Sequence, residues 1–360
     1  MEDPSREEAA MLLVQELAGD VPERYVIQVE DRPRAGAPVA PIPVIDLGLL
    51  SRQHTAEGVE ELARLRSALE SWGTFLVTNH GVEPSVMDAM WSAARDFFQR
   101  PIQEKKKYAD LDEIKHYDDY HEGYGTKQVK SPQQTSLEWS DRLLLQVEPQ
   151  DQRKLHLWPQ SLRDILLEFS VQQQCGLLTN GLLPAMATLL GLRKDYFTGL
   201  LRGGRNTTFA RINYYPMCQR PDLVCGVKPH SDATLISVLM VDENVDGLQI
   251  LIDDIWYHVP TASSKGHPHA LLVLVGDVVE IISNGVFKSP VHRAMTNAQK
   301  ERMSVVMFYG PDLDKEIGPA EELTDDSRPA RYKKVKGVDY LPAQYEHASR
   351  GERALDTLRI

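Results

Sequence analysis

Gly226-Val227-Lys228-Pro229-His230-Ser231-Asp232 leads directly into Ala233-Thr234-Leu235-Ile236-Ser237-Val238-Leu239-Met240-Val241, a short run rich in β-branched residues. Comparable runs, separated by Gly, Pro, Asp and Asn, occupy residues 207–215, 247–252, 270–275, 278–282 and 303–309. Short strands at this spacing, with turn residues between them, predict a β-sandwich or a jelly roll. The second half of the chain is therefore expected to be a mainly β core.

The first half of the chain has a helical pattern. Apolar residues recur every three to four positions across 59–72, and we expect further helices over 84–99 and 161–201. Strands are expected at 41–47 and 74–82, which makes the whole an α+β fold with a mixed region packed around the core. The polar, Tyr-rich segment 110–135 is predicted to be a loop over a cavity, and 11–17 a short helix.

The composition excludes several classes of function. Across 360 residues the net charge is −12, which argues against nucleic-acid binding, since that needs a basic surface. No apolar run approaches the ~20 residues of a membrane helix, and the acidic N-terminus does not resemble a signal peptide. Cys175, Cys218 and Cys225 form no CxxC pair, so we expect no disulfide framework and a cytoplasmic location.

His230 and Asp232 are two positions apart, and residues so spaced face the same side of a strand. His292 lies where a second strand could bring it close to both. Two imidazoles and one carboxylate form the facial triad that holds Fe(II) and leaves other positions open. A His-x-Asp pair is common by chance, so the hypothesis depends on the complete set. Other histidines show no comparable pattern and are expected to be surface or structural, namely His80, His116, His121, His258, His267 and His269.

The same spacing places Arg302 and Ser304 on one face of a strand, which Phe308 continues. A guanidinium and a hydroxyl can hold a carboxylate by charge-assisted hydrogen bonds, as a 2-oxo acid co-substrate would require. Asn213 and Tyr215 form a further pair two positions apart that could bind an acid. A half-buried core position is an equally good reading of Tyr215.

At these residues the chain resembles the plant Fe(II)- and 2-oxoglutarate-dependent dioxygenases, over about residues 41–311. Within that family it is most similar to the group holding leucoanthocyanidin dioxygenase, codeine O-demethylase and the herbicide-inactivating oxygenases. The segments that carry the resemblance are 42–47, 72–82, 213–218, 226–232, 247–249, 276–277, 283–285, 292–293 and 301–304.

The resemblance implies a distorted double-stranded β-helix, which is a jelly roll, supported by helices. It implies that His230, Asp232 and His292 bind iron and form the catalytic centre, and that Arg302, Ser304, Tyr215 and the nearby Asn213 bind 2-oxoglutarate. The implied cofactors are Fe(II), 2-oxoglutarate as co-substrate and O2, with ascorbate as reductant. The expected segments are an N-terminal arm (1–40), the dioxygenase N-terminal region (41–160), a helical support (161–204), the jelly-roll core (205–311) and a C-terminal segment (312–360).

The implied reaction is hydroxylation or demethylation of a small, largely apolar organic molecule, such as a specialised metabolite, a hormone or a xenobiotic. Arg142, Leu144, Arg211 and Phe308 are the candidates for the wall of the substrate pocket. Arg142 and Leu144 stand where flavonoid-oxidising members tend to carry aromatic residues, so a flavonoid is not the favoured substrate. We expect a monomer with no nucleic-acid or membrane partner. Two alternatives stay open, namely an iron oxidase that does not use 2-oxoglutarate and a catalytically silent small-molecule binding protein.

Overall fold

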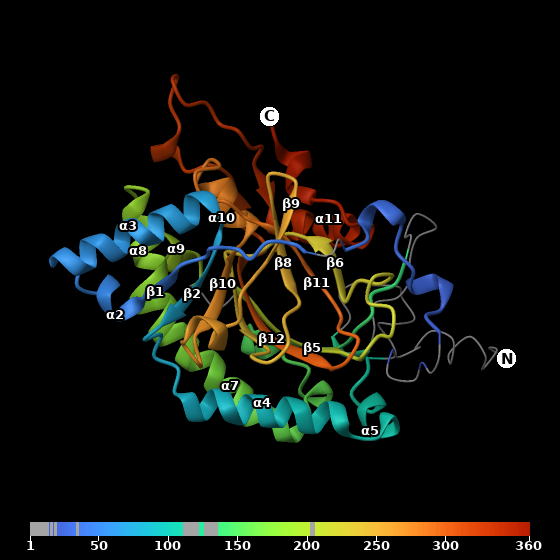
Figure 1. The fold of residues 1–360 in the computed structure, drawn as a ribbon. Coiled ribbons are helices and arrows are strands. Elements are labelled where there is room, and N and C mark those ends of the chain that lie inside the picture. The colour runs from blue at the N-terminus through green and yellow to red at the C-terminus, as the bar shows by residue number, and fades with distance from the viewer. Residues whose placement is uncertain are drawn as a thin grey trace.

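The computed structural model describes residues 14, 17, 20–33, 36–110, 122–125, 136–201 and 206–360. Two β-sheets lie at its centre (Figure 1). The larger contains β1 (Val44–Asp46), β2 (Thr74–Thr78), β3 (Gly123–Gly125), β4 (Asp141–Glu148), β5 (Asn206–Tyr215), β7 (Ile236–Val241), β10 (Leu271–Val275) and β12 (Arg302–Asp312). The smaller contains β6 (Val227–His230), β8 (Leu248–Ile252), β9 (Ile255–His258) and β11 (Val291–Ala294).

The strand order is β1-β2-β10-β7-β12-β5-β4-β3 in the larger sheet and β6-β11-β8-β9 in the smaller one. All these pairings are antiparallel except that of β1 with β2. A short ribbon also pairs β13 (Glu316–Ile317) with β14 (Val335–Lys336). The expected jelly-roll core is confirmed.

Helices cover the outer face of the larger sheet (Figure 1). They are α2 (Leu47–Leu50), α3 (Ala56–Ser71), α4 (Pro84–Gln99), α5 (Ile102–Lys106), α7 (Gln160–Gln172), the π-helical η6 (Gln173–Leu182), α8 (Leu183–Leu189) and α9 (Tyr196–Leu200). Later in the chain come α10 (Asp277–Ile282) and α11 (Gly337–Arg350). The 3-10 turns are η2 (Glu23–Tyr25), η3 (Val29–Asp31), η4 (Gln150–Gln152), η5 (Leu155–Leu157), η7 (Ser263–Lys265), η8 (Glu321–Leu323) and η9 (Ala354–Leu358).

The side chains of β12 alternate between two faces, and one of these faces lies between the two sheets. Met303, Val305 and Met307 pack in the core that the larger sheet shares with the helices. On the opposite face, Val306 and the partly buried Phe308 join the apolar cluster between the sheets. Because successive side chains of a strand point to opposite faces, the polar members of the Val306 face also lie between the sheets. The predicted face of this strand is confirmed.

Local sequence signals explain where the first helices begin and end. The side chain of Thr55 accepts a hydrogen bond of 3.1 Å from the backbone N–H of Gly58, which caps α3. Gly73 follows the end of this helix with a φ of +60°, a conformation that glycine adopts without strain. Pro84 begins α4, where its missing N–H costs no helical hydrogen bond. Both helices lie where the periodicity predicts them.

The predicted strand at 278–282 is wrong, because these residues form α10. Every residue of α10 is buried, so no polar alternation marks one face, and a short apolar run of this kind is ambiguous between strand and helix. Asp277 and Glu280 lie in its first turn, where acidic side chains are favourable. The helical stretch expected over 161–201 is continuous from α7 through the π-helical η6 to the end of α8, and a turn at Gly191 with a φ of +73° interrupts it.

Several expectations fall on residues outside the described ranges, including most of the loop at 110–135 and of the helix at 11–17. Of the loop, Tyr124 is described, and it lies in β3 with its ring 5.6 Å from that of Phe97 in the core. Cys175, Cys218 and Cys225 are free thiols, as expected. Among the described residues, no helix combines the length and the apolar character needed to cross a membrane.

Candidate metal and co-substrate site

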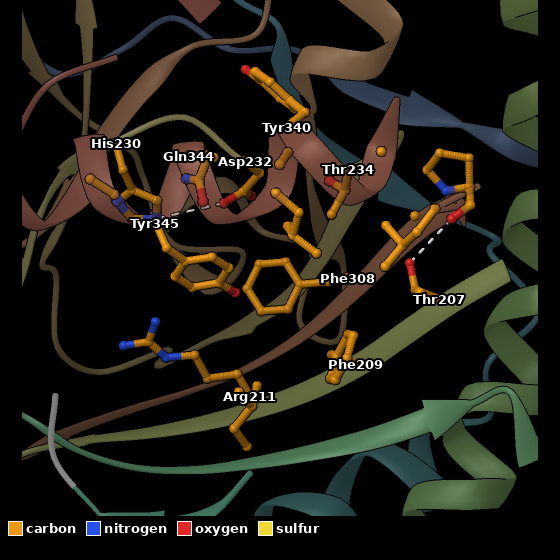
Figure 2. Close-up of a pocket in the computed structure, with 18 of the residues that line it drawn as sticks. Thr207, Phe209, Arg211, His230, Asp232, Thr234, Phe308, Tyr340, Gln344 and Tyr345 are labelled. Carbon is orange, nitrogen blue, oxygen red and sulfur yellow. Dashed lines mark hydrogen bonds and ion pairs between the residues drawn. The ribbon is translucent and has the colours of Figure 1, made fainter. Parts of the chain in front are cut away.

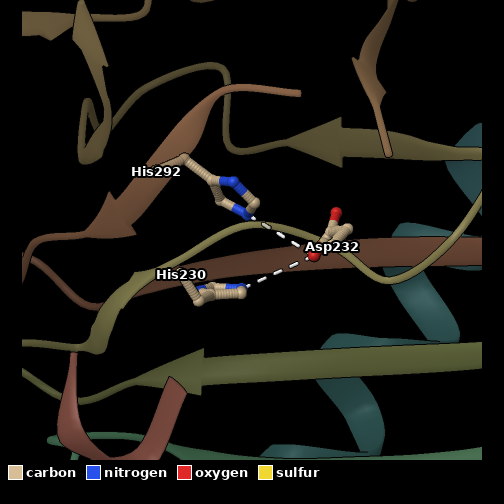
Figure 3. Close-up of side chains that lie close together, drawn as sticks. All are labelled: His230, Asp232 and His292. Atoms are coloured by element: carbon tan, nitrogen blue, oxygen red, sulfur yellow. Dashed lines mark ion pairs between the residues drawn. The ribbon is translucent and has the colours of Figure 1, made fainter. Parts of the chain in front are cut away.

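His230, Asp232 and His292 lie close together between the sheets (Figure 3). His230 ends β6 and is the cross-strand partner of His292 in β11. Nε2 of His230 lies 3.6 Å, and Nε2 of His292 3.7 Å, from Oδ1 of Asp232. One ligand atom from each residue therefore lies within 4.8 Å of the others, a spacing at which a single metal ion can bind all three.

Asp232 reaches this position from a loop, whereas the sequence predicted that it shares a strand with His230. β6 ends at His230, and the chain turns before β7 begins at Ile236. The carbonyl of Asp232 accepts a hydrogen bond of 2.8 Å from the N–H of Asp277. A Cβ on the preceding Gly276 would lie 2.0 Å from the carbonyl oxygen of Thr234, so only glycine permits this close approach.

Hydrogen bonds orient the two imidazoles for metal binding. Nδ1 of His230 donates to the carbonyl of Lys228 at 2.8 Å, and Nδ1 of His292 donates to that of Pro290 at 3.2 Å. Each ring therefore presents a lone pair on Nε2. Burial, together with the neighbouring His292, lowers the pKa of His230 to about 4, which keeps this imidazole neutral. Two imidazoles and one carboxylate fit Fe(II), which takes this donor set with open positions.

Arg302 lies at one end of the same cavity and is 3% exposed. Its guanidinium carbon is 5.0 Å from the ring centroid of Tyr215. Within the described part of the chain, Nε and Nη1 of Arg302 have no hydrogen-bond partner. Gly247 leaves the room that this side chain occupies, since a Cβ there would lie 2.9 Å from it. A buried guanidinium with unsatisfied N–H groups fits an anionic ligand such as a carboxylate.

Hydroxyl and amide groups surround the same position. The Asn213 amide donates a hydrogen bond of 3.1 Å to Oγ of Ser304, and the Tyr215 hydroxyl lies 3.5 Å from that oxygen. Ser304 is the cross-strand partner of Asn213, and Arg302 that of Tyr215, so two adjacent strands supply all four side chains. The His-Asp-His group also lines this hollow, which measures about 460 Å³ including its opening to solvent, so a molecule bound to Arg302 can reach a metal there.

A second hollow of about 880 Å³, including its open mouth, is lined by His230 and Asp232 as well (Figure 2). Leu144, Phe209 and Phe308 line it from the larger sheet, and Leu341 and Tyr345 line it from α11. The two hollows share Arg211, Val227, His230, Asp232 and Phe308. Apolar and aromatic side chains with a few polar groups among them are typical of pockets that bind small organic molecules.

Arg211 connects the two hollows. Its Nε donates a hydrogen bond of 2.5 Å to Oδ1 of Asn213, and its Nη2 lies 3.8 Å from Oε2 of Glu138. Nη2 has no hydrogen-bond partner among the described residues. It can therefore donate to a polar group of a bound molecule.

Comparison with known proteins identifies the family. Residues 207–311 match the 2OG-Fe(II) oxygenase superfamily, and residues 42–161 match the family described as non-haem dioxygenase in morphine synthesis N-terminal. The chain is 36% identical to Jasmonate-induced oxygenase 2 of Arabidopsis thaliana over 319 residues. This match covers 87% of the chain and 82% of that protein. The chain belongs to the 2OG-Fe(II) oxygenase superfamily. It is thus an oxygenase that uses Fe(II), 2-oxoglutarate and O2.

Other members of the superfamily extend the similarity over nearly the whole chain. Codeine O-demethylase of Papaver somniferum is 34% identical over 359 residues, covering 96% of this chain and 95% of that protein. The crystal structure of JOX2 in complex with 2OG, Fe and JA has a TM-score of 0.83 and 32% identity, covering 97% of this chain and 98% of that one. A dioxygenase for auxin oxidation in rice has a TM-score of 0.67 and 27% identity, covering 89% and 100%.

The structure brings together ten of the eleven side chains that the sequence predicts for the site. Those that line the two hollows are His230, Asp232, His292, Arg302, Ser304, Asn213, Tyr215, Arg211, Leu144 and Phe308. Arg142 is buried on β4 as the cross-strand partner of Asn213 and is not among the described residues that line either hollow.

Sequence reasoning missed several residues of the site. Phe209 lies two positions before Arg211 on the same strand, so period-2 spacing could have found it. Ser237 donates a hydrogen bond to Oδ2 of Asp232, and Glu138 faces Arg211, but neither carries a local sequence signal of this role. Tyr340 and Gln344 reach the site from α11, beyond the sequence motifs of residues 41–311.

Proposed function

We propose that this oxygenase hydroxylates or demethylates a small, largely apolar organic molecule. In this proposal His230, Asp232 and His292 hold the iron, and Arg302, Ser304 and Tyr215, with Asn213 nearby, hold 2-oxoglutarate. The observation that carries it is the pair of adjoining hollows, which are lined by different chemistry and meet at the His-Asp-His group. One hollow ends on a buried cation, and the other has mainly apolar walls.

Each side chain of the site has a distinct task. Fe(II) with 2-oxoglutarate and O2 supplies an oxidant able to attack a C–H bond. Asp232 would hold the metal through Oδ1 and offset part of its charge, and His230 and His292 would hold it through their Nε2 atoms. Arg302 and Ser304 fix the far carboxylate of the co-substrate and so set its orientation. Phe308 and Leu144 exclude water from the region beside the metal.

The walls of the larger hollow favour an apolar substrate that carries a polar group. Phe209, Phe308 and Leu144 offer apolar surface, and Nη2 of Arg211 offers a donor beside it. Named relatives include a jasmonate-induced oxygenase, a flavonoid 7-O-demethylase and codeine O-demethylase, so close homologues differ in substrate. Hydroxylation and O-demethylation both begin at a C–H bond, and one site can support either.

The two alternatives have less support. In an iron oxidase that does not use 2-oxoglutarate, no co-substrate carboxylate would pair with the buried Arg302. A silent binding protein would have no use for a complete His-Asp-His group with oriented imidazoles.

The experiment supplies the protein with Fe(II) and 2-oxoglutarate without oxygen, then adds oxygen together with a plant metabolite extract. We expect succinate release and products that have gained an oxygen atom or lost a methyl group, both detected by mass spectrometry. The matched control is His230→Ala, which should form neither. Products without succinate would favour the oxidase alternative, and binding of extract components without products would favour the binding protein. Ascorbate is predicted to prolong turnover in the same assay.

A further inference from the structure

The C-terminal helix α11 contacts the loop that runs from His230 to Asp232. Nε2 of Gln344 donates a hydrogen bond of 2.6 Å to the backbone carbonyl of Ser231. Ser231 is the single residue between His230 and Asp232. Gln344 and Ser231 are both buried, so water does not compete for this bond. Figure 2 shows Gln344 on α11 beside His230 and Asp232.

A second contact from α11 reaches the same loop through one intermediate. The hydroxyl of Tyr340 donates to Oδ2 of Asp277 at 2.7 Å, and Oγ of Ser231 donates to the same oxygen at 3.0 Å. The N–H of Asp277 in turn donates to the carbonyl of Asp232. Ser231 is therefore held at both its carbonyl and its side chain by groups that α11 supplies or positions.

The helix is itself fixed against the strand that carries the first ligand. Nζ of Lys228, in β6, donates a hydrogen bond of 2.9 Å to the carbonyl of Ser349 near the end of α11. Lys228 and Ser349 are both buried. The helix, the strand and the loop thus form one hydrogen-bonded unit.

These contacts matter because Asp232 lies outside any strand. A residue within a sheet is held in place by ladder hydrogen bonds, whereas a loop ligand needs support from side chains. Mutation of a residue that hydrogen-bonds to a metal ligand commonly weakens metal binding by 10- to 100-fold. The helix that supplies this support begins at Gly337, after the oxygenase match ends at residue 311.

We propose that Gln344 and Tyr340 are positioning residues that hold the His230–Asp232 loop in the geometry that binds Fe(II). The C-terminal segment is then part of the metal site as well as a wall of the substrate pocket. This proposal rests on the assignment of His230, Asp232 and His292 as the iron ligands.

The test compares three full-length variants with the wild type. Gln344→Met removes the donor to Ser231 at similar volume, and Tyr340→Phe removes the hydroxyl that contacts Asp277. The matched control is Tyr332→Phe, which removes a buried hydroxyl that donates to Glu280 at 2.7 Å and does not touch the loop. For each protein, Fe(II) affinity is measured without oxygen by competition with a coloured chelator, and thermal unfolding is measured without metal.

We expect Gln344→Met to raise the Kd for Fe(II) about 10-fold or more, and Tyr340→Phe to raise it by a smaller factor. Tyr332→Phe should stay within about twofold of the wild type, although all three lose a buried hydrogen bond and should unfold at lower temperature. A merely structural role would move only the unfolding temperature. If Gln344→Met and Tyr340→Phe bind Fe(II) as tightly as Tyr332→Phe does, the proposal is overturned.

Two further outcomes are decisive. If Gln344→Met does not fold, Tyr340→Phe decides alone, because wild-type affinity in that variant contradicts the proposed positioning. Failure of the ligand assignment has a different signature, in which His230→Ala binds Fe(II) as tightly as the wild type.

Discussion

The hydroxyl of Ser237 donates a hydrogen bond of 2.5 Å to Oδ2 of Asp232. Ser237 is fully buried in β7, so its position is fixed by the larger sheet. With Oδ2 engaged in this way, Oδ1 is the oxygen that faces the two imidazoles. This hydrogen bond therefore leaves Oδ1 as the carboxylate oxygen available to a metal ion between the imidazoles.

Ser237→Ala should weaken Fe(II) binding about 10-fold, because the carboxylate of Asp232 is then free to rotate. Anaerobic metal titration measures the affinity. Thr74→Val is the matched control, since it removes a buried hydroxyl that donates to Val273 at 2.8 Å in the same sheet, away from the site. Equal affinities in both variants would show that Ser237 does not orient the ligand.

Arg302→Ala should raise the KM for 2-oxoglutarate by about 10- to 100-fold, the loss expected when a charge-assisted contact of ~1.5–3 kcal/mol is removed. The KM for the organic substrate should change far less. Steady-state succinate formation at varied 2-oxoglutarate measures the effect. Lys300→Ala, at an exposed position just before β12, should behave as the wild type. Equal rises in both KM values for Arg302→Ala would contradict the assigned role.

Phe308→Ala should produce the opposite pattern. Loss of apolar contact should raise the KM for the organic substrate by about 10-fold, a cost of ~1.5 kcal/mol, while the KM for 2-oxoglutarate stays near that of the wild type. Succinate should also form in excess of product, because a loosely held substrate is attacked less often. Measuring both products in one reaction checks this, and a change confined to the KM for 2-oxoglutarate would contradict the proposed contact between Phe308 and the organic substrate.

The protein should lose stability as the pH falls below about 6.5, in part through His80. Nδ1 of His80 accepts a hydrogen bond of 3.2 Å from the N–H of Val82, and Nε2 donates to the carbonyl of His269 at 2.9 Å. Burial lowers the pKa of His80 below its ordinary value near 6.5. The unfolded chain therefore takes up this proton first, and the stabilisation present above pH ~6.5 is lost as the pH falls toward the folded-state pKa.

Denaturant unfolding at pH 7 and pH 5 measures this effect. His80→Asn should be less stable than the wild type at pH 7. Its free energy of unfolding should fall less than that of the wild type between pH 7 and pH 5, by at most ~1.4 kcal/mol per pH unit. His267→Asn, at an exposed position, should retain the wild-type dependence on pH. An unchanged pH dependence in His80→Asn would contradict this account of His80.

Local periodicity predicted those parts of the fold and site in which one face of an element differs from the other. Arg302, Ser304 and Phe308 could be placed on one side of β12 because strand geometry alone decides it. Val278 to Ile282 could not be assigned correctly, since α10 is buried on every side. Gln344 carried no signal, because its partner Ser231 lies 113 positions away in sequence and only the tertiary fold brings them together.

The central claim is that His230, Asp232 and His292 bind Fe(II) while Arg302 holds 2-oxoglutarate beside it. Anaerobic titration of the protein with Fe(II) and 2-oxoglutarate tests it most directly, because a 2-oxo acid chelated to Fe(II) absorbs visible light. The wild type should develop this absorption at one equivalent of Fe(II), His230→Ala and Asp232→Ala should not, and Arg302→Ala should need far more 2-oxoglutarate to reach it. The same absorption in His230→Ala and Asp232→Ala as in the wild type would contradict the assignment.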